Sequence, residues 1–190
     1  MAVLSAEWLA HRFQMNVLVL VRHPAAFVSS CKQLGWGFHF ENLLHQPLLI
    51  DKYFKQFEAE IIDHVNYEHE LIDKLTLLWK LIYTAVIDYQ DNNPEWLILR
   101  YEDICSQPLS QFNHIFKTFN IEFSTTAQKF IQESTNYSQF KGIFQEIHSI
   151  KRNAKAQIDI WKERLSQQEI DSIRSKVEDV SQHFYTDEDW

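Results

Sequence analysis

Apolar residues fill every position of one run near the start of the chain, from Val17 to Val21. A strand that is continuously apolar, rather than alternating, is typical of a parallel sheet that helices cover on both faces. A second run of this kind, Trp96 to Leu99, follows a turn at Asp91–Pro94. The pattern therefore predicts two buried strands, at residues 16–21 and 96–99.

Elsewhere the apolar residues recur three and four positions apart, which is the spacing of one helix face. Pro24 favours the first turn of a helix and Gly35 favours its end, so we expect a helix from Pro24 to Gln33. Ser166 and Glu169 have the spacing of a capping box at the start of the last long helix. The other helices are expected at 5–13, with Ser5 as N-cap, and at 49–62, 73–89, 109–119 and 126–133.

These elements predict an α/β fold in which helices alternate with parallel strands. Two parallel strands alone do not make a stable sheet, so we expect further strands upstream of Met1. The chain is thus interpreted as a single helix-rich domain over residues 1–190 that is incomplete at its N-terminus. Its acidic tail, residues 186–190, is expected to be loose.

Composition excludes several classes of protein. With 45% hydrophobic residues the chain can form a core, and 3 Gly and 4 Pro are too few for a turn-rich all-β fold. A formal net charge of −8 disfavours nucleic acid as a partner, and no apolar run is long enough for a transmembrane helix. Cys31 and Cys105 are interpreted as buried thiols in a reducing compartment, which predicts a cytoplasmic protein.

Candidate chemistry begins where the first strand ends, at Arg22. Ligands of open parallel sheets bind at the carboxyl ends of the strands, and a guanidinium there presents a fork of donors to a phosphate or carboxylate. The first turn of the next helix offers free N–H groups to the same anion. Ser30, eight positions after Arg22, could add a hydroxyl. The alternative is an arginine that pairs with a nearby acid and closes the strand end.

The segment from Val17 to Pro24, with Ser30 after it, resembles the strand–turn–helix that binds the 3′-phosphate in sulfotransferases that use 3′-phosphoadenosine-5′-phosphosulfate (PAPS). The resemblance assigns the 3′-phosphate to Arg22 and Ser30. The segment Leu97–Asp103 is similar to the strand of that family that ends in Tyr-Glu-Asp, which implies that Tyr101 lines the adenine pocket.

A third segment, Lys151-Arg152 with Trp161 beyond it, is similar to the basic loop that closes over the 3′-phosphate in this family. Asn153 stands where the family has a glycine. The resemblance implies a P-loop-NTPase-like parallel sheet flanked by helices, and transfer of a sulfuryl group from PAPS to a hydroxyl or amine of a small-molecule or glycan acceptor. The chain would supply the 3′-phosphate and adenine side of the site and leave adenosine 3′,5′-bisphosphate as product.

The glycine-containing loop that cradles the phosphosulfate in this family has no counterpart here. The only glycines are Gly35, Gly37 and Gly142, and Gly35-Trp-Gly37 is followed by Phe38-His39, without the Lys, Ser or Thr that such a loop needs. No catalytic residue is assigned. The missing half could come from a second copy of the chain or from a separate chain.

Two other functions stay open: a non-catalytic relic that binds a nucleotide or a protein, and a fragment of a P-loop kinase, which predicts magnesium dependence. His64 and His69 evoke a metal site, together with Glu68 and Glu70. A spacing of five does not place both histidines on one helix face, so we interpret them as part of a solvated helix surface and expect no metal.

Overall fold

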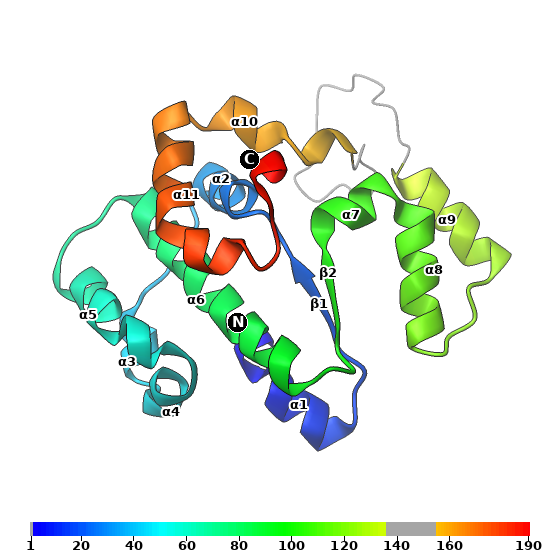
Figure 1. Cartoon of the computed structure of the whole chain (residues 1–190), viewed down its shortest axis with the longest axis horizontal. Coiled ribbons are helices and arrows are strands. Elements are labelled where there is room, and N and C mark those ends of the chain that lie inside the picture. The colour runs from blue at the N-terminus through cyan, green and yellow to red at the C-terminus, as the bar shows by residue number, and fades with distance from the viewer. Residues whose placement is uncertain (1, 136–154) are drawn as a thin grey trace.

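Two short parallel strands, β1 (Leu18–Val21) and β2 (Leu97–Arg100), form the sheet of the computed structural model, which describes residues 2–135 and 155–190. Leu18 lies opposite Leu97 and Val21 lies opposite Arg100. Both strands were predicted, as was the helix-rich α/β class (Figure 1).

Helices make up most of the described chain (Figure 1). Those before β2 are α1 (Ala6–Phe13), α2 (Pro24–Leu34), α3 (Glu41–Leu44), α4 (Pro47–Leu49), α5 (Glu58–Asn66) and α6 (Leu71–Asn92). Those after it are α7 (Tyr101–Ser106), α8 (Pro108–Thr118), α9 (Thr125–Thr135), α10 (Ile160–Arg164) and α11 (Gln167–Ser181). Short 3-10 turns at Ala2–Ser5, Lys55–Phe57, Lys155–Gln157 and Asp187–Asp189, and a π turn at Ile50–Phe54, link them.

A local signal in the sequence explains the start of α11. The capping box predicted for α11 is present: the Glu169 N–H donates to Ser166 Oγ, and the Ser166 N–H donates to Glu169 Oε2. Such a box satisfies N–H groups that the helix itself leaves free. Ser5 stands at the N-cap position of α1, as predicted, but its side chain makes no capping hydrogen bond.

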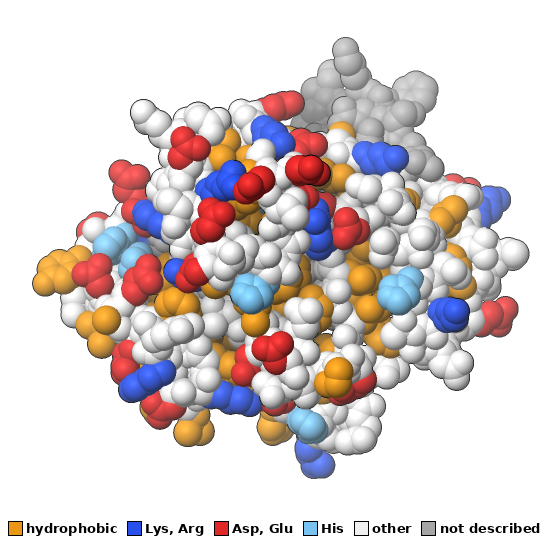
Figure 2. Space-filling model, in the orientation of Figure 1, with side chains coloured by type: hydrophobic (Ala, Val, Ile, Leu, Met, Phe, Trp, Pro, Cys, Tyr) orange, Lys and Arg blue, Asp and Glu red, His pale blue; other side chains and the backbone are white. Residues whose placement is uncertain are grey.

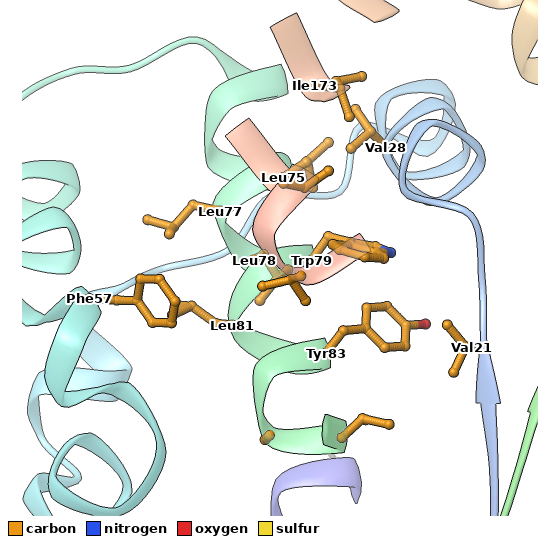
Figure 3. Packing of buried hydrophobic residues seen from close by; sticks show 14 of the residues in the cluster. Val21, Val28, Phe57, Leu75, Leu77, Leu78, Trp79, Leu81, Tyr83 and Ile173 are labelled. Atoms are coloured by element: carbon orange, nitrogen blue, oxygen red, sulfur yellow. The ribbon is translucent and has the colours of Figure 1, made fainter. Parts of the chain in front are cut away.

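The core is built around α6, which crosses the middle of the molecule (Figure 1). Figure 3 shows Trp79 and Tyr83 pointing from α6 toward β1, while Leu77 and Leu81 point toward Phe57. Trp79 is fully buried, and complete burial of a large apolar side chain contributes roughly 1.5–3 kcal/mol. Because α6 packs in both directions, it fixes the position of β1 relative to the rest of the chain.

Only one face of β1 is fully covered. Val19 and Val21 point into the core, but Leu20, on the opposite face, is 45% exposed. The prediction that both faces are buried is therefore wrong for this strand. The physical reason is that, among the described residues, Leu20 lines an open hollow beside α1 and α6, so about half of its side chain stays uncovered.

The acidic tail is docked rather than loose, which corrects the expectation for residues 186–190. Its last turn carries a capping box between Thr186 and Asp189, and Asp189 forms an ion pair with Arg100. The ring of Trp190 packs against His23, with 4.4 Å between ring centroids. The ion pair and the aromatic contact together outweigh the conformational entropy that the tail loses when it docks.

Charged side chains of both signs are interspersed over the face of the molecule shown in Figure 2. No helix in the described ranges combines the length and the apolar character that crossing a membrane requires. Cys105 is buried as expected, whereas Cys31 is only half-buried, and burial raises the pKa of both thiols. Both thiols are therefore protonated near neutral pH and poorly nucleophilic.

Candidate anion-binding site

Arg22 is held by its backbone at the carboxyl end of β1. Its N–H donates to Tyr83 Oη at 3.0 Å, and its carbonyl accepts a hydrogen bond from Trp79 Nε1 at 2.8 Å. Both partners come from α6, which Figure 3 shows beside the strand. The site therefore starts from a fixed backbone position, and only the side chain of Arg22 is left to adapt.

The Arg22 guanidinium has no carboxylate partner in the part of the chain that the structure describes. Its Cζ lies 5.3 Å from the centre of the Tyr101 ring, at the start of α7, and no ion pair joins it to an acid within residues 2–135 and 155–190. Its Nε is buried and makes no hydrogen bond there. Buried donors of folded proteins are nearly always bonded, so an unpaired one calls for an explanation.

Arg100 stands at the same end of β2 and behaves differently. Its Nη1 donates to Asp189 Oδ2 at 3.2 Å, its Nη2 also bonds that carboxylate, and its Nε lies 3.6 Å from Asp103 Oδ2. Its Cζ also lies 4.7 Å from the centre of the Tyr185 ring. Arg100 is thus the arginine that closes a strand end by pairing with acids, the alternative considered for Arg22.

Tyr101, predicted to line the adenine pocket, follows β2 directly, and the Arg22 guanidinium lies over the face of its ring. Burial raises the pKa of its phenol to about 12, so the hydroxyl is protonated near neutral pH. Ser30 lies in α2, eight residues from Arg22, and is half-buried. Lys151 and Arg152 lie outside the described residues.

Glu102 organises the site, although its sequence position gave it no predicted role. Its buried carboxylate accepts the His23 N–H at 3.1 Å and the Tyr185 hydroxyl at 2.9 Å. It therefore ties the end of β2 to the start of α2 and to the C-terminal segment. The Tyr-Glu-Asp motif draws attention to this residue, but its partners are 79 and 83 positions away and are invisible in the local pattern.

His23, next to Arg22, forms the packed back of the site. Its ring stacks on Trp161 with 4.8 Å between centroids and meets the rings of Tyr185 and Trp190 edge-on. Burial lowers its pKa to about 3, so the imidazole is neutral near neutral pH. Arg22 is therefore the charged member of this pair of neighbours.

The start of α2 adds a further feature that suits an anion. Pro24 occupies the first turn, and the N-cap residue His23 makes no side-chain cap, while its N–H donates to Glu102. The positive end of the helix dipole, beside the guanidinium of Arg22, favours a negative group there. The arrangement can bind a phosphate or carboxylate; it offers no nucleophile or base of raised reactivity.

A scan against protein-family models, a search of curated proteins and a search of solved structures each found no match to this chain.

Proposed function

We propose that Arg22 binds the 3′-phosphate of an adenosine 3′,5′-bisphosphate nucleotide, and that the chain is the nucleotide-binding part of a PAPS-dependent sulfotransferase domain. One observation carries the proposal: within residues 2–135 and 155–190 the guanidinium at the carboxyl end of β1 has no acid to pair with, while Arg100, its counterpart on β2, pairs with Asp189. A cationic donor that the protein leaves unpaired is suited to an anionic ligand.

Each residue of the site has a defined part in this function. Arg22 gives two parallel N–H donors to phosphate oxygens, and Ser30 adds a hydroxyl from the next turns of α2. Tyr101 supplies an aromatic wall next to the phosphate for the adenine ring. Glu102 positions the strand end without touching the ligand, through its bonds to His23 and Tyr185.

The described residues fit one end of PAPS only. They offer hydrogen-bond donors for the 3′-phosphate and an aromatic wall for the adenine. No glycine loop for the phosphosulfate lies among them. PAPS supplies the sulfuryl group that the complete domain would transfer to a hydroxyl or amine of a small molecule or glycan. We assign no catalytic residue, because none of the described side chains beside Arg22 offers a base.

We further propose that an additional strand completes a P-loop-like parallel sheet along the outer edge of β1, where it would replace the long hydrogen bond that the Tyr83 hydroxyl donates to the Leu20 carbonyl, at 3.4 Å. In a parallel pair of strands, every second residue directs its backbone N–H and C=O toward the partner strand. The Leu97 N–H donates to the Val17 carbonyl, so the backbone groups of Leu18 and Leu20 point away from β2. A largely apolar cavity of about 480 Å³ lies along this side, lined in part by Leu20, Ile82 and Val86. A strand from another chain, or from a longer form of this one, would fill it.

Calorimetric titration with adenosine 3′,5′-bisphosphate tests the site. We compare the wild type with Arg22→Met, which keeps the apolar stem, and with Arg12→Met, the same change at an exposed arginine. Loss of a bidentate charge-assisted contact of about 3 kcal/mol weakens binding roughly 150-fold for Arg22→Met, and Arg12→Met binds as the wild type does. Equal affinity of all three proteins contradicts the assignment.

A non-catalytic nucleotide- or protein-binding module is the second candidate, and the lack of a base among the described side chains beside Arg22 favours it. It shares the nucleotide site, so binding does not separate the two. Transfer of labelled sulfate from PAPS to phenolic, amine and glycan acceptors does, and it is measured without magnesium and with it. Magnesium-dependent phosphoryl transfer from ATP would instead point to a kinase-like fragment.

A further inference from the structure

The turn between α5 and α6 brings together two histidines that the sequence pattern had placed on different faces of one helix. α5 ends at Asn66, and Tyr67 is extended, so the chain reverses before it reaches His69. The His64 and His69 rings stack with 3.9 Å between centroids and 11° between planes. Their interpretation as a solvated helix surface is therefore wrong, because it assumed that the helix continued to His69.

His64 is held in the tautomer that a metal ligand needs. Its Nδ1 lies 3.0 Å from the Glu60 carbonyl oxygen, which can only accept, so Nδ1 carries the hydrogen. Nε2 therefore has a free lone pair, and it is buried with no hydrogen-bond partner in residues 2–135 and 155–190. Histidines that bind metals show this arrangement, with the second ring nitrogen donating to a carbonyl or carboxylate.

Asp63 and His69 supply two more donor atoms beside that lone pair. His69 Nε2 lies 2.9 Å from Asp63 Oδ2, yet the two do not form a hydrogen bond of normal geometry. One ligand atom from each of Asp63, His64 and His69 lies within 4.8 Å of the others. Ligands about 2.1 Å from a tetrahedral zinc are roughly 3.4 Å apart, so small side-chain rotations close the set around one ion.

The surrounding charges leave room for a cation. The three side chains line a cavity of about 230 Å³ that also contains Glu60, Lys80 and Lys176. Lys80 Nζ lies 3.0 Å from Asp179, and Lys176 pairs with Asp73, so carboxylates already hold both ammonium groups. The Glu60 carboxylate has no ion-pair partner within the described ranges and can offset positive charge at the cavity.

We propose that Asp63, His64 and His69 bind a divalent first-row transition metal, with Zn²⁺ as the ion that suits them best. Two imidazoles and one carboxylate are ligands that zinc accepts, and a water would fill the fourth position. The ion would join the last turn of α5 to the segment that leads into α6. The site is separate from the strand ends that hold Arg22, and it does not depend on the function proposed there.

Titration of metal-free protein tests the proposal directly. We expect Zn²⁺ to bind with one-to-one stoichiometry in calorimetry and to raise the thermal unfolding midpoint, because an ion that binds only the folded state stabilises it. Co²⁺ added in place of Zn²⁺ should give the visible absorption bands of a four-coordinate site. Absence of saturable one-to-one binding overturns the proposal.

Variants locate the ion. Asp63→Asn and His69→Gln change half-exposed or partly exposed side chains, so the protein should still fold, and each should weaken Zn²⁺ binding at least about tenfold and change the Co²⁺ spectrum. His45→Gln, at an exposed histidine elsewhere, is the matched control. Unchanged Zn²⁺ affinity in both site variants, or an equal loss in His45→Gln, shows that the histidine pair is a stacked surface contact and contradicts the proposal.

Discussion

The two arginines at the strand ends allow a stability experiment that separates a ligand-binding role from a structural one. Arg22→Met and Arg100→Met remove the guanidinium and keep most of the apolar stem, so each isolates the polar interactions of its arginine. If Arg22 serves a ligand, its removal from the ligand-free protein costs little. Removal of Arg100 breaks contacts that the folded chain uses.

The magnitudes follow from the contacts. Arg100 loses a paired contact with Asp189, in which the side chains are 27% and 21% exposed. Hydrogen bonds to charged partners contribute roughly 1.5–3 kcal/mol, so we expect Arg100→Met to lower the free energy of unfolding by about 2 kcal/mol. Among the described residues, Arg22 loses its cation–π contact with Tyr101, worth about 0.5–1 kcal/mol. The buried Nε of both arginines lacks a hydrogen-bond partner there, so its removal offsets part of the loss in each variant and leaves Arg22→Met close to the wild type.

Urea denaturation, followed by tryptophan fluorescence and by far-ultraviolet circular dichroism, measures both variants against the wild type. We expect the unfolding free energy of Arg22→Met within about 0.5 kcal/mol of the wild type, while Arg100→Met falls clearly below it. A loss in Arg22→Met as large as that in Arg100→Met would show that Arg22 has a structural partner, and the argument from its unpaired guanidinium would then fail.

Three further predictions address other parts of the molecule. The Leu20 amide, on the free edge of β1, should exchange with solvent faster than the Val21 amide, which bonds to β2; equal rates in hydrogen-exchange NMR would argue against a free edge. Burial lowers the pKa of His23 to about 3, so unfolded chains bind one more proton between pH 6.5 and 3, and stability falls by about 1.4 kcal/mol per pH unit as pH drops through that window. His23→Phe should flatten this slope in pH-dependent denaturation, and an unchanged slope would contradict the burial argument. Glu102→Gln should lower the unfolding free energy by about 1–3 kcal/mol, since it weakens two buried bonds; a variant as stable as the wild type would mean that they contribute little.

Local pattern was sufficient for most elements of this fold. Continuous apolar runs predicted β1 and β2, and Pro24 with Gly35 placed both ends of α2. The spacing of Ser166 and Glu169 predicted the start of α11. These features depend on residues a few positions apart, where chain geometry alone dictates which side chains meet.

The features that the pattern missed depend on contacts between distant residues. The pairing of Arg100 with Asp189 spans 89 positions and docks a tail whose charge alone suggested a loose segment. The exposure of Leu20 depends on which elements cover β1, and an apolar run gives no information on that. The meeting of His64 with His69 depends on where α5 ends, and helix ends are the least certain part of a pattern.

The central claim is that the end of β1 recognises a 3′-phosphate, and comparison of two nucleotides tests it most directly. Wild-type protein is titrated in a calorimeter with adenosine 3′,5′-bisphosphate and, separately, with adenosine 5′-monophosphate, which lacks the 3′-phosphate. We predict that the bisphosphate binds at least about tenfold more tightly, a difference of about 1.4 kcal/mol. Equal affinity for the two nucleotides would contradict the account, because the site would then make no use of the group that Arg22 is proposed to hold.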